Sequence, residues 1–138
     1  MPSLSVALKN DRRELVRLAQ LVERFAADHH LPDDVLTNVN LVLDEVVSNV
    51  VKYGRAPAEG VAADVSLTLA GDRLTIQVSD SGIAFNPLDA RPPNLDLPIM
   101  DRPVGGLGIH IVRTLAEDLN YRRENNRNHL SLSMRVGA

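Results

Sequence analysis

Cysteine is absent from this chain of 138 residues, which excludes disulfides and thiolate metal sites. An excess of basic residues is absent as well, since 15 lysines and arginines stand against 18 acidic residues and the net charge is −3. Without a basic field to hold a phosphate backbone, we expect no direct nucleic-acid partner. No apolar run has the length of a signal peptide or a membrane span, so we expect a cytoplasmic protein with no membrane partner.

Internal repeats, low-complexity segments and domain boundaries are also missing from the sequence. Hydrophobic residues make up 44% of the chain and charged residues 24%, as in ordinary globular proteins. A chain of this length suits one hydrophobic core. The sequence therefore predicts a single domain over residues 1–138.

The first half of the chain predicts one strand followed by two helices. Residues 3–8 alternate polar and apolar side chains, as a short strand does. Asn10 or Asp11 is the expected N-cap of the first helix, whose apolar residues follow helical spacing. Pro32, followed by two acids, predicts the start of a second helix that ends near Gly54.

The second half predicts two hairpins separated by a long loop and a helix. Four segments alternate as strands do, in two pairs: residues 63–70, 73–80, 120–125 and 129–136. Gly71-Asp72 predicts the first hairpin turn, and Asn125 to Asn128 the second. Helices grouped between hairpins indicate an α+β fold, with a mixed, mostly antiparallel sheet and the helices on one face.

Between the hairpins lies a segment with no periodicity, residues 83–104, which holds five of the eight prolines. A loop of this length in a compact domain is either disordered or a functional lid. The run that follows, residues 105–119, has apolar residues on one helical face and predicts a helix.

The second predicted helix carries a polar stripe among its valines. Asn38, Glu45, Asn49 and Lys52 fall within roughly 60° at helical spacing. On the helix pattern alone, this stripe is best interpreted as the solvent-facing side. The alternative is a ligand site, in which Glu45 accepts a proton or orients a nucleophile and the carbonyl oxygen of Asn49 suits Mg²⁺.

Two further motifs have both a structural and a functional interpretation. Asp80-Ser-Gly82 ends a predicted strand, where it could form a turn or accept a hydrogen bond from an exocyclic amine beside a flat ring. The GGLG run at 105–108 opens a predicted helix, where it could be a hinge or a cradle for phosphates. The chain contains neither a P-loop motif nor a dinucleotide-binding fingerprint.

The order of these motifs is more specific than any one of them. Along the chain come Glu45-x-x-x-Asn49, Asp80-x-Gly82, the proline-rich loop and the run at 105–108. In this order the chain resembles the GHKL ATP-binding fold shared by gyrase, histidine kinases and MutL. Within that group it most resembles the small anti-sigma factor serine kinases of the RsbW/SpoIIAB type, over nearly its whole length.

The resemblance implies a two-layer α/β sandwich and a role for each motif residue. Glu45 would be the general base or would orient the attacking hydroxyl, and Asn49 would ligate Mg²⁺. Asp80 would bind the adenine amine of ATP, with Gly82 beside the ring. Asn128 lies near the position at which the family often has a threonine behind the adenine.

The resemblance also implies a phosphate cradle and a lid. The cradle would be formed by Gly105, Gly106, Leu107 and Gly108, and the ATP lid by residues 83–104. Two departures from the family pattern occur: Lys52 or Tyr53 stands where a histidine is common, and Ala84 and Asn86 stand where a glycine and an aspartate are common. These departures bear on catalytic rate more than on ATP binding.

The implied activity is transfer of the γ-phosphoryl group of ATP to a serine or threonine of a small, STAS-type anti-anti-sigma antagonist. The implied free kinase is a homodimer that sequesters a sigma factor. One alternative is a nucleotide-binding interaction module without phosphotransfer. A second, the catalytic half of a histidine kinase, is disfavoured by the short lid and by the absence of a preceding helix with a phosphoacceptor histidine.

Overall fold

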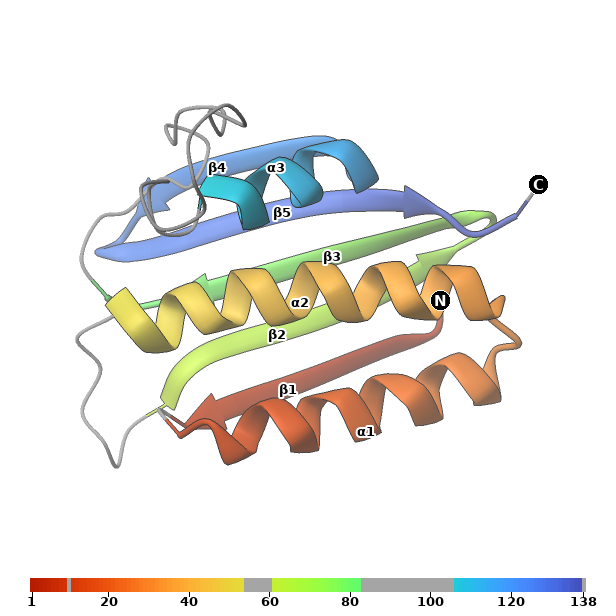
Figure 1. Ribbon diagram of the computed structural model, residues 1–138, viewed down its shortest axis with the longest axis horizontal. Helices are drawn as coiled ribbons and strands as arrows, with labels where there is room; N and C mark the ends of the chain where they lie inside the picture. The colour runs from red at the N-terminus through yellow and green to blue at the C-terminus, as the bar shows by residue number, and fades with distance from the viewer. Residues whose placement is uncertain (10, 54–60, 83–105, 138) are drawn as a thin grey trace.

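Five strands and three helices form the two layers of the computed structural model, which describes residues 1–9, 11–53, 61–82 and 106–137. The elements in chain order are β1 (Ser3–Lys9), α1 (Arg13–Asp28), α2 (Asp33–Tyr53), β2 (Val61–Ala70), β3 (Arg73–Asp80), α3 (Gly106–Leu115), β4 (Glu117–Glu124) and β5 (Arg127–Arg135). Figure 1 shows all three helices on one face of the sheet. The predicted α+β sandwich is confirmed.

The sheet has the order β1-β2-β3-β5-β4. Every pairing between its described strands is antiparallel, so the expected mixed character is not seen among them. Because β5 lies between β3 and β4, the last two strands join the sheet in reverse order. The path from β3 through α3 to β4 is therefore a crossover between two strands that point the same way (Figure 1).

The core lies between the two layers and follows the strand alternation. Along β3, the even-numbered residues from Leu74 to Asp80 are buried, and the odd-numbered ones are more exposed. Val39, Val42 and Val47 of α2 are fully buried against this side of the sheet. The period-two pattern that predicted the strands therefore also determines which face of the sheet meets the helices.

Shortening a core side chain on β3 tests this alternation. Ile76 is fully buried, so Ile76→Val should lower the free energy of unfolding by about 0.5–1.5 kcal/mol. The neighbouring Thr75 faces away from the helices, so Thr75→Val is the matched control and should change it by less than about 0.5 kcal/mol. Urea denaturation measures both. Equal losses would contradict the assignment of faces.

The helix predicted over residues 105–119 is shorter in the structure. Helix α3 ends at Leu115 and β4 begins at Glu117. Asp118 adopts a positive φ of 51°, and the pairing register shifts between Glu117 and Asn120. The prediction was wrong because Leu119 follows Leu115 at helical spacing, yet it reaches the core from a strand.

The second hairpin turn is also tighter than predicted. Asn125 and Asn126 have φ values of 53° and 60°, as the two central residues of a type I′ turn do. Arg127 and Asn128, which were expected in the turn, belong to β5. Asparagine tolerates this left-handed conformation better than most residues, so two residues suffice to reverse the chain.

The first helix begins two residues later than its predicted cap. Arg12 occupies the N-cap position and makes no side-chain capping bond. Asp11 nevertheless contributes, since its Oδ1 accepts a hydrogen bond from the backbone N–H of Arg13 at 2.9 Å. That bond, with the Arg13 guanidinium, lowers the pKa of Asp11. The other candidate cap, Asn10, and the loop 54–60 lie outside the described residues.

Glu14 joins the start of α1 to the end of β1. Its Oε1 accepts a hydrogen bond from the backbone N–H of Lys9 at 2.9 Å, and its Oε2 accepts one from Nε of Arg17 at 2.6 Å. Arg17 in turn donates to the carbonyl oxygen of Ala7 at 2.7 Å. The Arg17 guanidinium first, and then the Lys9 N–H, hold the pKa of Glu14 below its ordinary value.

This junction should make stability depend on acid pH. Because the pKa of Glu14 is lower in the folded state, its stabilising effect is complete above its unfolded pKa, near 4.5, and is lost as pH falls through the folded pKa. We expect Glu14→Gln to lower the urea midpoint at pH 7 and to have a smaller effect at about pH 3. Glu23→Gln, on an exposed face of the same helix, is the control. A pH-independent difference would contradict this role.

Candidate functional site

Four elements have one of their two ends at the same side of the molecule. Figure 1 shows that α2 and β3 finish there, and that α3 and β5 begin there. The sequence motifs fall on these four ends: Glu45 and Asn49 on the last turns of α2, Asp80 at the end of β3, Gly106 at the start of α3, and Asn128 near the start of β5. The fold therefore gathers segments that are far apart in the sequence.

Asp80 is a buried carboxylate, only 7% exposed, on the helix-facing side of the sheet. One of its oxygens, Oδ2, accepts two hydrogen bonds: from the backbone N–H of Gly82 at 2.9 Å and from Nδ2 of Asn128 at 3.1 Å. The other oxygen, Oδ1, has no hydrogen-bond partner among the residues that the structure describes. Asp80 therefore presents one unpaired acceptor at the end of β3.

Asn128 pairs directly across the sheet from Asp80 and is 6% exposed. Its Oδ1 accepts hydrogen bonds from the hydroxyl of Tyr121 at 2.5 Å and from Nη1 of Arg123 at 3.2 Å. Both donors belong to β4, whose odd-numbered residues from Leu119 share the helix-facing side with Asn128. A row of polar side chains therefore crosses three strands and ends on the Asp80 carboxylate.

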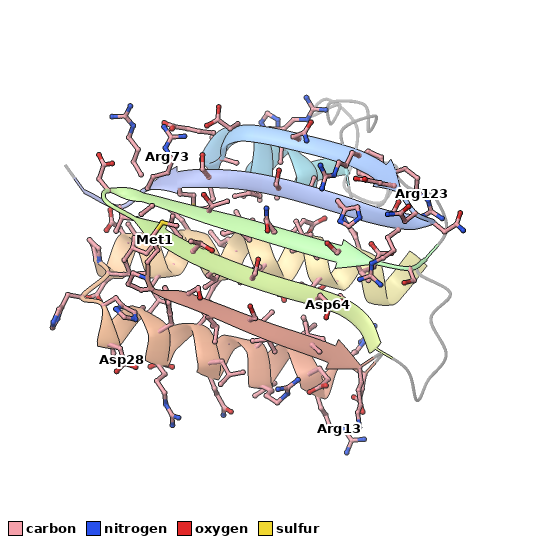
Figure 2. All side chains as sticks on the ribbon, turned by 180° about the vertical axis from the view of Figure 1, so that it is seen from behind. Met1, Arg13, Asp28, Asp64, Arg73 and Arg123 are labelled. Carbon is pink, nitrogen blue, oxygen red and sulfur yellow. The ribbon has the colours of Figure 1, made fainter. Side chains whose placement is uncertain are left out.

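Two arginines hold the turn that follows Asp80. Arg123 donates to the carbonyl oxygen of Gly82 at 2.7 Å. On the opposite face of the sheet, Arg127 donates to the hydroxyl of Ser81 at 2.7 Å and forms an ion pair with Asp64 at 2.8 Å. Asp64 and Arg123, both labelled in Figure 2, lie near this end of the sheet. The Asp80-Ser-Gly82 turn is therefore fixed from both sides.

Glu45 and Asn49 are half-buried and adjacent, one helical turn apart on α2. Nδ2 of Asn49 donates to Oε1 of Glu45 at 3.3 Å, a long hydrogen bond. This contact directs the carbonyl oxygen of Asn49 away from Glu45, and it leaves Oε2 of Glu45 without a donor among the described residues. The pair offers two oxygens of different character, one anionic and one neutral.

The flank of α2 that carries this pair faces α3 rather than α1. The groove between α1 and α2 is lined by Asn40 and Asp44, among others. At 100° per residue, Glu45 lies about 100–140° around the helix from those two residues. Since α1 and α3 lie on opposite sides of α2 in Figure 1, the flank of α2 turned away from the α1 groove is the one on the side of α3. Both side chains are half-buried, so they are partly accessible from this side.

Helix α3 begins at Gly106 with no acidic residue in its first turn. Its N-terminal N–H groups carry partial positive charge, which favours an anion. Gly106 and Gly108 have no side chain that could stand in the way of that anion. Gly105 and the lid segment 83–104 lie outside the described residues, as do the side chains of Leu107, Lys52 and Tyr53.

The structure brings Asp80, Gly82 and Asn128 into direct hydrogen-bonding contact, and it pairs Glu45 with Asn49. Tyr121, Arg123 and Arg127 were not singled out from the sequence. For Tyr121 and Arg123, the signal in the sequence is the alternation along β4, which puts both on the same face. That signal is hidden when the preceding helix is predicted to continue to residue 119.

A family model for the histidine kinase-like ATPase domain matches residues 8–134. The chain therefore belongs to the histidine kinase-like ATPase domain family, which confirms the family resemblance found in the sequence. No helix in the described parts of the chain is both long enough and apolar enough to cross a membrane.

Among individual relatives, the chain is similar to two bacterial protein kinases. It is 28% identical over 95 residues to the serine/threonine-protein kinase BtrW of Bordetella bronchiseptica, which is 69% of this chain and 67% of BtrW. It is 29% identical over 90 residues to the serine-protein kinase RsbW of Bacillus cereus, which is 62% of this chain and 56% of RsbW. The match thus spans little more than half of RsbW.

Solved structures share the fold at low sequence identity. The structure of the RsbU and RsbW domains of Rv1364c from Mycobacterium tuberculosis matches with a TM-score of 0.71 and 16% identity, over 99% of this chain and 33% of that one. The SiaB–SiaC complex from Pseudomonas aeruginosa matches with a TM-score of 0.60 and 15% identity, over 95% of this chain and 88% of that one.

The residues present fit a magnesium–nucleotide complex. Asn49 offers a carbonyl oxygen, the kind of ligand that Mg²⁺ prefers beside water and phosphate oxygens. The unpaired Oδ1 of Asp80 suits an amine donor on a purine. The N-terminus of α3, which has no acidic residue in its first turn, suits phosphate. The metal, the base and the phosphates thus each have a chemically matched group on this side of the molecule.

Proposed function

We propose that this chain is an ATP-dependent protein serine/threonine kinase that also acts as an anti-sigma factor in a bacterial partner-switching system. The observation that carries the proposal is the buried Asp80 carboxylate, which is held by Gly82 and Asn128 and has one oxygen with no partner in the described parts of the chain. In a histidine kinase-like ATPase fold, such an acceptor supports recognition of the adenine amine. The names of the relatives BtrW and RsbW, both protein kinases, support phosphoryl transfer to a protein.

In this proposal each polar group on α2 has a separate task. Asn49 would hold Mg²⁺, which neutralises charge on the phosphates when it is bound. Glu45, through its unpaired Oε2, would accept a hydrogen bond from the substrate hydroxyl and align it with the γ-phosphate. The hydrogen bond from Asn49 to Oε1 would fix the rotamer of Glu45 during this step.

The phosphate end of the ligand would lie at the start of α3. Backbone N–H groups of the segment from Gly105 to Gly108, with Leu107 among them, would contact the phosphates, and residues 83–104 would form the lid. Phosphoryl transfer depends mainly on such positioning and on charge stabilisation, and it needs no covalent intermediate on the protein.

The protein partners follow from the family resemblance and from the names of the relatives. The acceptor would be a serine or threonine of a small STAS-type anti-anti-sigma antagonist. The unphosphorylated antagonist would compete for the kinase and release a sigma factor. Phosphorylation adds negative charge, which would weaken an apolar or acidic interface and return the kinase, acting as a homodimer, to the sigma factor.

A direct test takes as candidate antagonist a small STAS-type protein, sought first among the reading frames that neighbour this gene. Incubation of the two proteins with Mg-ATP should add one phosphate to a serine or threonine, as detected by mass spectrometry. Omitting magnesium should prevent the transfer. Binding of ATP without any phosphotransfer to that antagonist would favour the second candidate, a nucleotide-dependent interaction module, which the half-buried Glu45–Asn49 pair alone does not distinguish from a kinase.

A further inference from the structure

We propose that Tyr121 and Arg123 of β4 are positioning residues that make the site selective for a purine carrying an exocyclic amine. They would do so without touching the base, by fixing the orientation of Asn128 and, through it, of the Asp80 carboxylate. This inference rests on the proposed nucleotide site and deepens it. It concerns residues that the sequence motifs do not include.

The first step is the orientation of the Asn128 amide. Its Oδ1 lies within 3.2 Å of Nη1 of Arg123, and a guanidinium can donate hydrogen bonds but cannot accept them. The hydroxyl of Tyr121 reaches the same oxygen at 2.5 Å. With the oxygen held by two donors, the Nδ2 group must point at Asp80, which it contacts at 3.1 Å.

The second step is the occupancy of the Asp80 oxygens. Oδ2 already accepts hydrogen bonds from Asn128 and from the backbone of Gly82, so both of its lone-pair directions are used. Only Oδ1 remains for a ligand. A base with one amine hydrogen aimed at this oxygen is accepted, whereas a base with a carbonyl oxygen at the same place would bring two acceptors together.

The third step is that Arg123 links this orientation to the turn. The same Nη1 that contacts Asn128 also donates to the carbonyl oxygen of Gly82 at 2.7 Å. Gly82 follows Asp80 by two residues and supplies the other donor to Oδ2. Arg123 therefore fixes both groups that occupy Oδ2. Loss of either β4 donor would therefore hold the Asn128 amide less firmly in this orientation.

Adenosine and inosine triphosphates differ at the position of this amine, so together they test the proposal. Calorimetric titrations of the full chain with Mg-ATP and with Mg-ITP would be made for the wild type, Tyr121→Phe and Arg123→Met. Tyr121→Phe removes one part-buried hydrogen bond and Arg123→Met removes two. We expect each variant to raise the Kd for ATP by about 3–10-fold and to leave the Kd for ITP within about twofold. Arg122→Met is the matched control, because Arg122 is exposed on the opposite face of β4 and should change neither constant.

The outcomes separate this inference from the proposed function. A wild-type protein that binds neither nucleotide would contradict the proposed nucleotide site and, with it, this inference. A wild-type protein that binds ATP, with variants that weaken ATP and ITP equally or weaken neither, would overturn the inference alone. Should Arg123→Met lose its cooperative urea transition, Arg123→Lys replaces it, and Tyr121→Phe, which removes only the hydroxyl, still decides the question.

Discussion

Replacing Glu45 with alanine is expected to reduce phosphotransfer to the antagonist by about 10²–10⁴-fold, the usual effect of losing a positioned acid–base group. The substitution removes the carboxylate that would align the substrate hydroxyl, but it leaves Asp80 and the start of α3 in place. The Kd for Mg-ATP should therefore stay within about threefold of the wild-type value. Single-turnover transfer of labelled phosphate and calorimetry measure the two quantities.

The control for this variant is the adjacent residue. Asp44 carries the same charge on the same helix, but it is exposed and lies about 100° away, on the side toward α1. Asp44→Ala should leave both the transfer rate and ATP affinity unchanged. A Glu45→Ala protein with full transfer activity would show that the carboxylate has no part in the chemistry, whereas loss of ATP binding would assign it to the ligand instead.

Replacing Asp80 with asparagine should weaken ATP binding by about 10–100-fold. An asparagine has the same size, but its NH₂ group would face donors in either orientation: the Gly82 N–H and the Asn128 amide at the Oδ2 position, or the adenine amine at the Oδ1 position. Loss of a hydrogen bond to a charged acceptor typically costs about 1.5–3 kcal/mol, which corresponds to that range of Kd. The stabilisation that Mg-ATP gives against thermal unfolding should shrink in parallel.

The matched control is Asp72→Asn, at the other end of β3. Asp72 lies in the exposed turn between β2 and β3, far along the strand from Asp80. Its conversion to asparagine should leave ATP affinity unchanged. Equal ATP affinity in the Asp80→Asn variant and the wild type would remove the principal support for an adenine site at the end of β3.

The sequence was sufficient to predict the two layers and the motif-bearing ends of the elements. Valine spacing on α2 and alternation on β3 are local patterns, and both reflect the same buried interface. Local patterns also place Glu45 one turn before Asn49, and Asp80 at a strand end. These predictions needed no knowledge of which strands are neighbours, and for that reason they agree with the structure.

The contacts around Asn128 could not be predicted from the sequence, because they depend on the order of the strands in the sheet. Asn128 meets Asp80 because β5 pairs with β3, and it meets Tyr121 and Arg123 because β4 lies on the other side of β5. No local pattern reveals this order. Tyr121 and Arg123 were hidden for a second reason, since Leu119 at helical spacing favoured a longer helix. The position of Leu119 in β4 depends on the left-handed backbone of Asp118, a conformation that is uncommon outside glycine.

The insertion of β5 between β3 and β4 also has a consequence for the order in which the contacts of the domain form during folding. The hydrogen bond from Asn128 to Asp80 joins residues 48 apart, and that from Arg123 to Gly82 joins residues 41 apart. Such long-range contacts form late, because the intervening chain must first be ordered. Until β5 is in place, β3 is paired only with β2, and the contacts around the Asp80 carboxylate are incomplete.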